Sequence, residues 1–178
     1  MTIETRIEPG TTVRLAGIQF TYRLTGQQSE GKQAQVEVTA EPQIFFAPPH
    51  LHLNEDESMY VIEGDCLVQN GKDVFKASAG DSVFLPKGMP HAIANAGDTP
   101  ARVLLTLTPA GMEPYFAELA EALPDAPPLP AAAFADVDGF MEQMAANPET
   151  VPIMATLGAL WQKYGLQGAR SAGAPAAQ

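Results

Sequence analysis

The stretches HLHLNEDESMYVIEG, residues 50–64, and GDSVFLPKGMPHAIAN, residues 80–95, together contain every histidine of the chain. His50 and His52 are separated by one residue, so in an extended segment both side chains leave the same face of a strand. His91 follows a turn-like sequence in the second stretch, and an antiparallel neighbouring strand would carry it back toward the first pair. The pattern therefore predicts that the three imidazoles meet in space.

Glu57 adds a carboxylate to this set, because it begins the strand-like run ESMYVIE. Glu55 and Asp56 lie in the polar turn before that run, so Glu57 is the preferred ligand. Three imidazoles and a carboxylate suit one first-row divalent metal per chain with coordination positions left open: iron, manganese, nickel, cobalt, copper or zinc. A lone histidine is usually a surface or core residue, but the gathering of all three in two glycine-bounded stretches favours the metal site.

Composition limits the class of protein and its partners. The 178 residues, 46% of them hydrophobic, are enough for a single domain with one substantial core. A net charge of −11 repels phosphate backbones and anionic lipid headgroups, which argues against nucleic-acid and membrane-surface partners. We therefore expect a small-molecule partner.

Cysteine usage and terminal sequences indicate the compartment. Cys66 is the single cysteine, which excludes an intramolecular disulfide and a thiolate zinc cluster, and its neighbours favour a buried apolar role. The N-terminal sequence MTIETRIEPG lacks the apolar core of a signal peptide, and no stretch approaches the about 20 apolar residues that cross a bilayer. We expect a cytoplasmic protein.

Residues 11–108 consist of short segments rich in β-branched and aromatic residues, separated by glycine- and proline-containing turns, a pattern typical of a sandwich or barrel. Helical spacing follows in residues 113–123, 137–147 and 149–165, whose apolar stripes would pack on the barrel. The expected organisation is a β-barrel with N-terminal strands over residues 1–112, a helical extension over 113–166 and a mobile tail over 167–178.

The two histidine stretches resemble the two motifs of the cupin family. His50-x-His52, four residues, Glu57, six residues and Gly64 resemble the first motif. In the second stretch Gly80, Pro86-x-Gly88, His91 and Asn95 resemble the second motif. The glycine expected ahead of the first histidine is absent, since Phe45 to Pro49 stand there, but this departure affects the entry to the strand and not a ligand.

The resemblance implies an all-β core, namely a double-stranded antiparallel β-barrel of the cupin or jelly-roll type, followed by a C-terminal α-helical extension. It also implies a metal held by His50, His52, Glu57 and His91, and a homodimer formed through sheet edges. The extension ending in LWQKYGLQG is similar to the quercetin 2,3-dioxygenase-like group of single-domain cupins. That similarity implies a dioxygenase that uses dioxygen to cleave an aromatic enol of the flavonol type, with Glu57 as the catalytic base.

Four apolar residues are expected to contact the substrate. Met59, Val61 and Ile93 share side-chain parity with neighbouring candidate ligands, so they would point into the cavity, and Phe46 is expected to join them. Because one fold hosts many activities, two alternatives stay open. One is a metal-dependent isomerase or epimerase of a sugar or keto acid, and the other is a module that binds a metal or small ligand without turnover.

Overall fold

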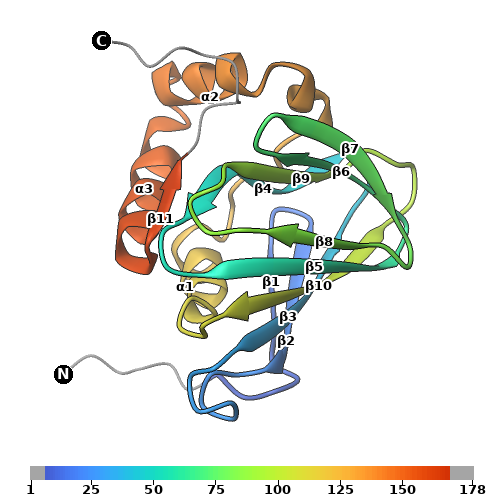
Figure 1. Cartoon of the computed structure of the whole chain (residues 1–178). Coiled ribbons are helices and arrows are strands. Elements are labelled where there is room, and N and C mark those ends of the chain that lie inside the picture. The colour runs from blue at the N-terminus through green and yellow to red at the C-terminus, as the bar shows by residue number, and fades with distance from the viewer. Residues whose placement is uncertain (1–6, 169–178) are drawn as a thin grey trace, which may run out of the picture.

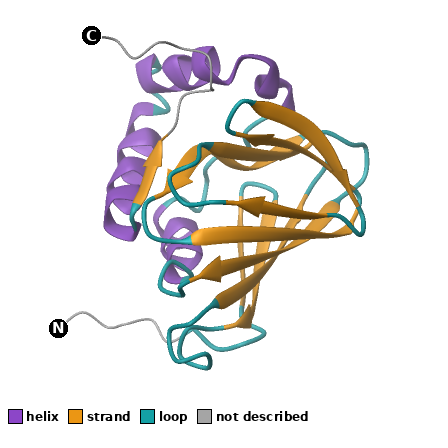
Figure 2. Ribbon diagram, viewed as in Figure 1, coloured by secondary structure: helices purple, strands orange, loops and turns teal. Residues whose placement is uncertain are grey.

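The computed structural model describes residues 7–168, which form two facing antiparallel sheets and a group of helices at one side (Figures 1 and 2). The larger sheet has six strands, in the spatial order β1 (Thr12–Leu15), β2 (Ile18–Leu24), β3 (Ala34–Ala40), β10 (Ala101–Thr108), β5 (Asp56–Glu63) and β8 (Ser82–Leu85). The smaller sheet has five strands, in the order β11 (Leu166–Gly168), β4 (Ile44–His52), β9 (His91–Asn95), β6 (Asp65–Asn70) and β7 (Asp73–Ser78).

This architecture confirms the expected all-β core of the jelly-roll type with C-terminal helices. Its two sheets are not closed into a continuous barrel, because hydrogen bonding within residues 7–168 leaves β1 and β8 as edges of one sheet and β11 and β7 as edges of the other. The site therefore lies between two sheets that meet through side chains. Packing, and not a continuous hydrogen-bond ladder, sets the spacing between them.

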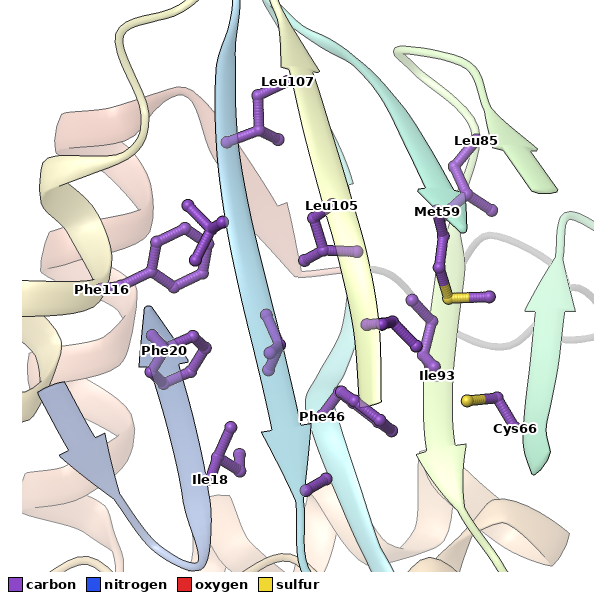
Figure 3. Packing of buried hydrophobic residues seen from close by; sticks show 14 of the residues in the cluster. Ile18, Phe20, Phe46, Met59, Cys66, Leu85, Ile93, Leu105, Leu107 and Phe116 are labelled. Carbon is purple, nitrogen blue, oxygen red and sulfur yellow. The ribbon is translucent and has the colours of Figure 1, made fainter. Parts of the chain in front are cut away.

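The core follows from strand alternation. In β3 and β10 every second side chain is buried, as expected for strands with one face turned inward. Tyr22, Val36 and Leu107 are completely buried, and each fully buried apolar side chain of this size contributes roughly 1.5–3 kcal/mol to folding. Figure 3 shows part of this cluster, with Leu105 and Leu107 on one sheet and Ile93 and Cys66 on the other. Cys66 is buried, as the sequence indicated.

β4 is continuous although it contains Pro48 and Pro49. Proline cannot donate to a β-ladder and is tolerated at bulges. The pairing of β4 with β9 accordingly shifts register on both sides of Ala47 and resumes where His50 lies opposite His91. The irregularity thus falls immediately before the first histidine, where the expected motif glycine is missing.

The helices form where the apolar spacing predicts them: α1 (Pro114–Ala122), α2 (Val137–Ala146) and α3 (Val151–Tyr164), with a short 3-10 helix η1 (Ala131–Asp136) before α2. The Asp136 side chain accepts a hydrogen bond from Gly139 N and caps α2. α3 ends at Gly165, whose positive φ of 68° is the left-handed conformation that glycine adopts without strain. The chain then turns into β11.

β11 is an addition that the sequence pattern did not predict. It pairs antiparallel with β4, so Leu166 lies opposite His52. Gln167 and Gly168, which the sequence assigned to the tail, belong to this strand; the rest of that expected tail, residues 169–178, lies outside the described residues. Within residues 7–168, no helix has the length and apolar character needed to span a bilayer.

Candidate metal centre

The four predicted ligands lie together between the two sheets. His50 and His52 belong to β4, His91 to the adjacent β9, and Glu57 to β5 of the opposite sheet. One ligand atom from each residue lies within 4.8 Å of the others, and all four side chains are buried. A first-row metal with bonds of about 2 Å to nitrogen and oxygen fits a set of this size.

Strand pairing explains how the local sequence positions each side chain. His50 and His91 are direct partners across β4 and β9, and their ring centroids are 4.5 Å apart. Glu57 lies between two fully buried leucines, Leu107 on β10 and Leu85 on β8, which are its partners in the ladder. Directly opposed residues share a face, so the carboxylate points into the sandwich with its apolar neighbours.

Backbone carbonyls fix two of the three imidazole rings. His50 Nδ1 lies 2.8 Å from Pro48 O, and His91 Nδ1 lies 3.1 Å from Met89 O. A carbonyl can only accept, so each Nδ1 carries the proton and each Nε2 is left with a free lone pair. His91 Nε2 and both ring nitrogens of His52 are buried and make no well-aligned hydrogen bond, although carboxylate oxygens lie near the two nitrogens of His52. Buried, orphaned imidazole nitrogens aimed at one point are what a metal site requires.

The charge state also suits metal binding. Burial, followed by the neighbouring rings, lowers the pKa of His50 well below its ordinary value, and burial likewise lowers the pKa of His91. Burial opposes the charged form of Glu57, but His52 and the other histidines outweigh it and lower the pKa of Glu57 to about 2. Two neutral imidazoles and an ionised carboxylate at neutral pH are the protonation states that ligands need.

His52 differs from the other two histidines because carboxylates flank both of its nitrogens. Its Nε2 is 3.1 Å from Glu57 Oε2, and its Nδ1 is 3.6 Å from Glu55 Oε2. Burial disfavours the charged ring, but Glu55 and Glu57 outweigh this effect and raise the pKa of His52 to about 9. Without a metal, His52 is therefore the ring that holds the positive charge between two acidic groups.

Glu55 is the residue near the centre that sequence reasoning missed. It was assigned to a polar turn, yet only 5% of it is exposed. The available signal was strand alternation: Glu55, Glu57, Met59 and Val61 are all buried at every second position. Extending the period of β5 by one step toward the N-terminus would have placed Glu55 on the inner face.

A cavity of about 40 Å³ lies beside the centre, and His50 and Glu57 form part of its wall. Phe46 and Ile93, two of the expected substrate contacts, line it. Met59 and Val61 are buried in the core between the sheets and are not part of the cavity wall. The remaining wall residues are Phe20, Val38, Ala47, Leu105, Met112, Tyr115, Phe116 and Trp161.

The helical extension contributes to this wall, which the motifs did not indicate. Tyr115 and Phe116 come from α1 and Trp161 from α3, and Trp161 Nε1 donates to Tyr115 Oη at 3.0 Å. The Trp161 ring also stacks near His50, with centroids 6.2 Å apart. The sequence predicts only that the apolar stripes of these helices pack on the barrel, since helical spacing alone does not distinguish a core contact from a cavity wall.

Asn95, the final residue of the second motif, holds a turn. Its Nδ2 donates to the carbonyls of Ala40, Glu41 and Thr99, and its Oδ1 accepts from Gly97 N. The motif thus divides into residues that face the centre and residues that shape the backbone around it.

Comparisons with known proteins agree with the fold and the motif positions. Residues 36–107 match the family model described as the cupin domain. The tetracenomycin polyketide synthase protein TcmJ from Streptomyces glaucescens is 35% identical over 91 residues, 51% of this chain and 58% of its own length. The polyketide synthase CurC from Streptomyces cyaneus is 32% identical over 65 residues, 36% of this chain and 42% of its own length.

This chain thus spans only about half the length of these curated relatives. Among solved structures, a predicted oxalate decarboxylase from Thermotoga maritima superimposes with a TM-score of 0.52 at 21% identity, covering 55% of this chain and 91% of that one. At this identity the likeness concerns the fold alone. It does agree with the two facing antiparallel sheets described above.

Proposed function

We propose that this protein, which belongs to the cupin superfamily through its domain at residues 36–107, is a metal-dependent enzyme acting on an aromatic or enolic small molecule. One observation carries the proposal. Three imidazoles and a carboxylate converge within 4.8 Å, and two of the four line a cavity whose other walls are almost entirely apolar. A polar reactive group next to an apolar body is the substrate shape that this arrangement fits.

His50, His52, His91 and Glu57 would hold the metal, and each of these side chains has a ligand atom facing the common point. A bound divalent transition metal supplies a positive charge that stabilises an enolate oxygen and, if it is redox-active, electrons for dioxygen chemistry. The chain's own contribution is to exclude water and to fix the two rings whose Nδ1 atoms are hydrogen-bonded to carbonyls. That fixation leaves little reorganisation for the moment of reaction.

Glu57 would act as the base that takes the proton of an enol. Its carboxylate lies in the cavity wall, where a substrate would meet it. A base must reach the proton that it removes, and among the four ligands only His50 and Glu57 are part of that wall. His52 and His91 lie behind them, where they support the centre.

For the reaction itself we propose oxidative cleavage by dioxygen, as in the quercetin 2,3-dioxygenase-like cupins that the chain resembles. Deprotonation of the enol by Glu57 would make the ring carbons electron-rich, and both atoms of dioxygen would enter the cleaved product while the ring carbon between the two broken bonds leaves as carbon monoxide. The aromatic wall formed by Phe46, Phe116 and Trp161 supports a flat substrate. A sugar would leave most of its hydroxyl groups unpaired against these side chains, which disfavours the isomerase alternative.

A second candidate, ring closure in a polyketide without oxidation, is favoured by one specific observation. Both curated relatives described above are polyketide synthase proteins. A polyketide chain carries enolisable carbonyl groups, so it would use the same first step, removal of a proton by Glu57. The two candidates differ in whether dioxygen is consumed.

The test combines metal analysis with oxygen consumption. We expect about one transition-metal ion per purified chain, and metal-dependent oxygen uptake with a panel of flavonols, catechols and polyphenolic enols. Conversion of a substrate without oxygen uptake and without mass gain would replace cleavage by cyclisation. No conversion with any metal would leave the non-catalytic binding module as the function. Glu57→Gln is the diagnostic variant, because we expect it to lose turnover by about 100-fold or more while retaining most of the metal.

A further inference from the structure

A second cavity, larger than the one at the metal centre, lies between the sandwich and the helical extension. Its volume is about 100 Å³, which approaches that of an engineered cavity that holds a benzene ring. One wall comes from β2 and β4, and the other from α1, α2 and α3. We call it the outer chamber, and the cavity beside His50 and Glu57 the inner chamber.

The two chambers share part of their walls. Phe20, Phe46, Ala47, Tyr115 and Phe116 line both of them. Phe20 and Phe116 are stacked with centroids 4.7 Å apart, and Figure 3 shows this pair beside the six-stranded sheet. A few side chains therefore separate the outer chamber from the metal ligands, and rotation of aromatic rings would join the two spaces.

The chemistry of the outer chamber restricts its occupant. Among the described residues that line it, none is charged, and Tyr115 alone carries a hydroxyl group. That hydroxyl already accepts a hydrogen bond from Trp161 Nε1. A charged or strongly polar ligand would be desolvated there without compensation, whereas an aromatic ring or short hydrocarbon segment would gain burial.

We propose that the outer chamber binds the apolar end of the substrate, an uncharged aromatic ring or acyl segment, while the enolic end lies in the inner chamber. This inference rests on the proposed function, because that function places the reactive oxygen at the metal centre. It assigns a role to the helical extension: α3 forms the far wall of the chamber and selects the size of the apolar end. Met154 lines the outer chamber and not the inner one.

The test uses fluorobenzene as a probe of the metal-free protein, followed by fluorine NMR. We expect saturable binding to the wild-type chain and at least about tenfold weaker binding to Met154→Trp, because the larger side chain fills the chamber. Ala155→Trp is the matched control, since Ala155 is the next residue of α3 and is exposed. It should bind fluorobenzene like the wild type.

The outcomes separate this inference from the proposed function. Two outcomes would refute binding of an apolar group in the outer chamber: equal fluorobenzene binding in Met154→Trp and Ala155→Trp, or no binding to the wild-type chain. Circular dichroism of both variants establishes that each is folded. Failure to find metal or turnover would refute the proposed function. The fluorobenzene result would still stand, because that test uses the metal-free protein and the candidate metal ligand His91 lines neither chamber.

A second inference concerns Glu55 and rests on different observations. His52 Nδ1 and Glu55 Oε2 face each other at 3.6 Å, both are buried, and neither has a hydrogen-bond partner among the described residues. The other two histidines have their Nδ1 atoms bonded to backbone carbonyls. We infer that Glu55 is the positioning residue of His52: its carboxylate accepts a hydrogen bond from Nδ1–H when Nε2 binds a metal, and so supplies the orienting group that a carbonyl supplies elsewhere.

The test of Glu55 is metal affinity, measured by competition of Co²⁺ with a chelator, together with the visible absorption spectrum of the Co²⁺-loaded protein. We expect Glu55→Gln to bind Co²⁺ about 10–100-fold more weakly and with a shifted spectrum, since loss of an outer-shell partner has effects of this size. Asp56→Asn is the control, because Asp56 accepts from Lys87 N and does not touch the centre. Wild-type affinity and spectrum in Glu55→Gln would refute the role, and Co²⁺ binding by the wild type would still support the metal centre.

Discussion

The two sheets contribute differently to the candidate metal centre. The five-stranded sheet supplies all three imidazoles, from the neighbouring strands β4 and β9, and direct pairing of His50 with His91 sets their separation. The six-stranded sheet supplies the single carboxylate, Glu57, from β5. Within residues 7–168 no strand ladder joins the two sheets, so the position of Glu57 relative to the histidines depends largely on side-chain packing.

This difference suggests that the histidines and Glu57 have different roles at the centre. Ligands held by one ladder are fixed with the precision of strand pairing, whereas a ligand from the facing sheet moves with the spacing of the core. The histidines should therefore dominate metal affinity, and Glu57 should be the member that can leave the metal and accept a proton.

The largest effect is expected from removing a ligand of the five-stranded sheet. His50→Ala or His91→Ala should lower metal affinity by more than about 100-fold, because loss of even an outer-shell partner lowers it 10–100-fold. Glu57→Gln should lower it far less, since the amide oxygen can still bind. Inductively coupled plasma analysis of dialysed protein checks these values. Equal losses in His91→Ala and Glu57→Gln would show that the two sheets hold the metal alike.

A smaller effect is expected from loosening the packing that supports Glu57. Leu107 is completely buried and is the ladder partner of Glu57, so Leu107→Ala should reduce the free energy of unfolding by about 2–5 kcal/mol. Turnover should fall more than metal content, because the substitution displaces the Glu57 carboxylate and leaves the histidines in place. Urea denaturation measures the first quantity, and activity per bound metal measures the second.

The matched control for this variant is Leu53→Ala. Leu53 is 55% exposed, so the same chemical change should alter the free energy of unfolding by no more than about 0.5 kcal/mol. A Leu107→Ala protein with wild-type activity per metal would contradict the idea that packing positions Glu57.

The smallest expected effect concerns Cys66 on β6, which faces the opposite sheet. Burial raises the pKa of its thiol to about 12. Below that pH the reactive thiolate is scarce, so disulfide exchange with an aromatic disulfide reagent at pH 8 should be slow in the folded protein and fast in urea, where the pKa returns to about 8.5. Rapid reaction in the folded state would indicate that the two sheets separate readily.

Sequence reasoning located the four ligands because strand alternation and motif spacing are local properties. His50 and His52 needed only an extended segment to share a face, and the turn before His91 fixed where the second stretch begins. The same reasoning predicted α1, α2 and α3. These features depend on residues that are near one another in the chain.

Sequence reasoning did not predict the features that depend on contacts between segments far apart in the chain. Trp161 and Tyr115 reach the inner chamber because the helices fold back on the sandwich, and helical spacing does not specify the face that a helix meets. β11 is three residues long and too short for a periodic signal. Met59 and Val61 have the predicted parity, but parity gives the face of a strand and not the depth at which a side chain lies.

The pairing of β11 with β4 has a consequence for biosynthesis. The histidine-bearing strand acquires its outer neighbour from a segment that leaves the ribosome after all three helices have been made. Until then the edge of β4 at His50–His52 is unpaired, and an unpaired edge is the feature of a sheet most prone to associate with other chains. Maturation of the centre is thus tied to completion of the helical region, so nascent chains interrupted before residue 166 would expose their ligand strand to the cell's metal pool and to each other.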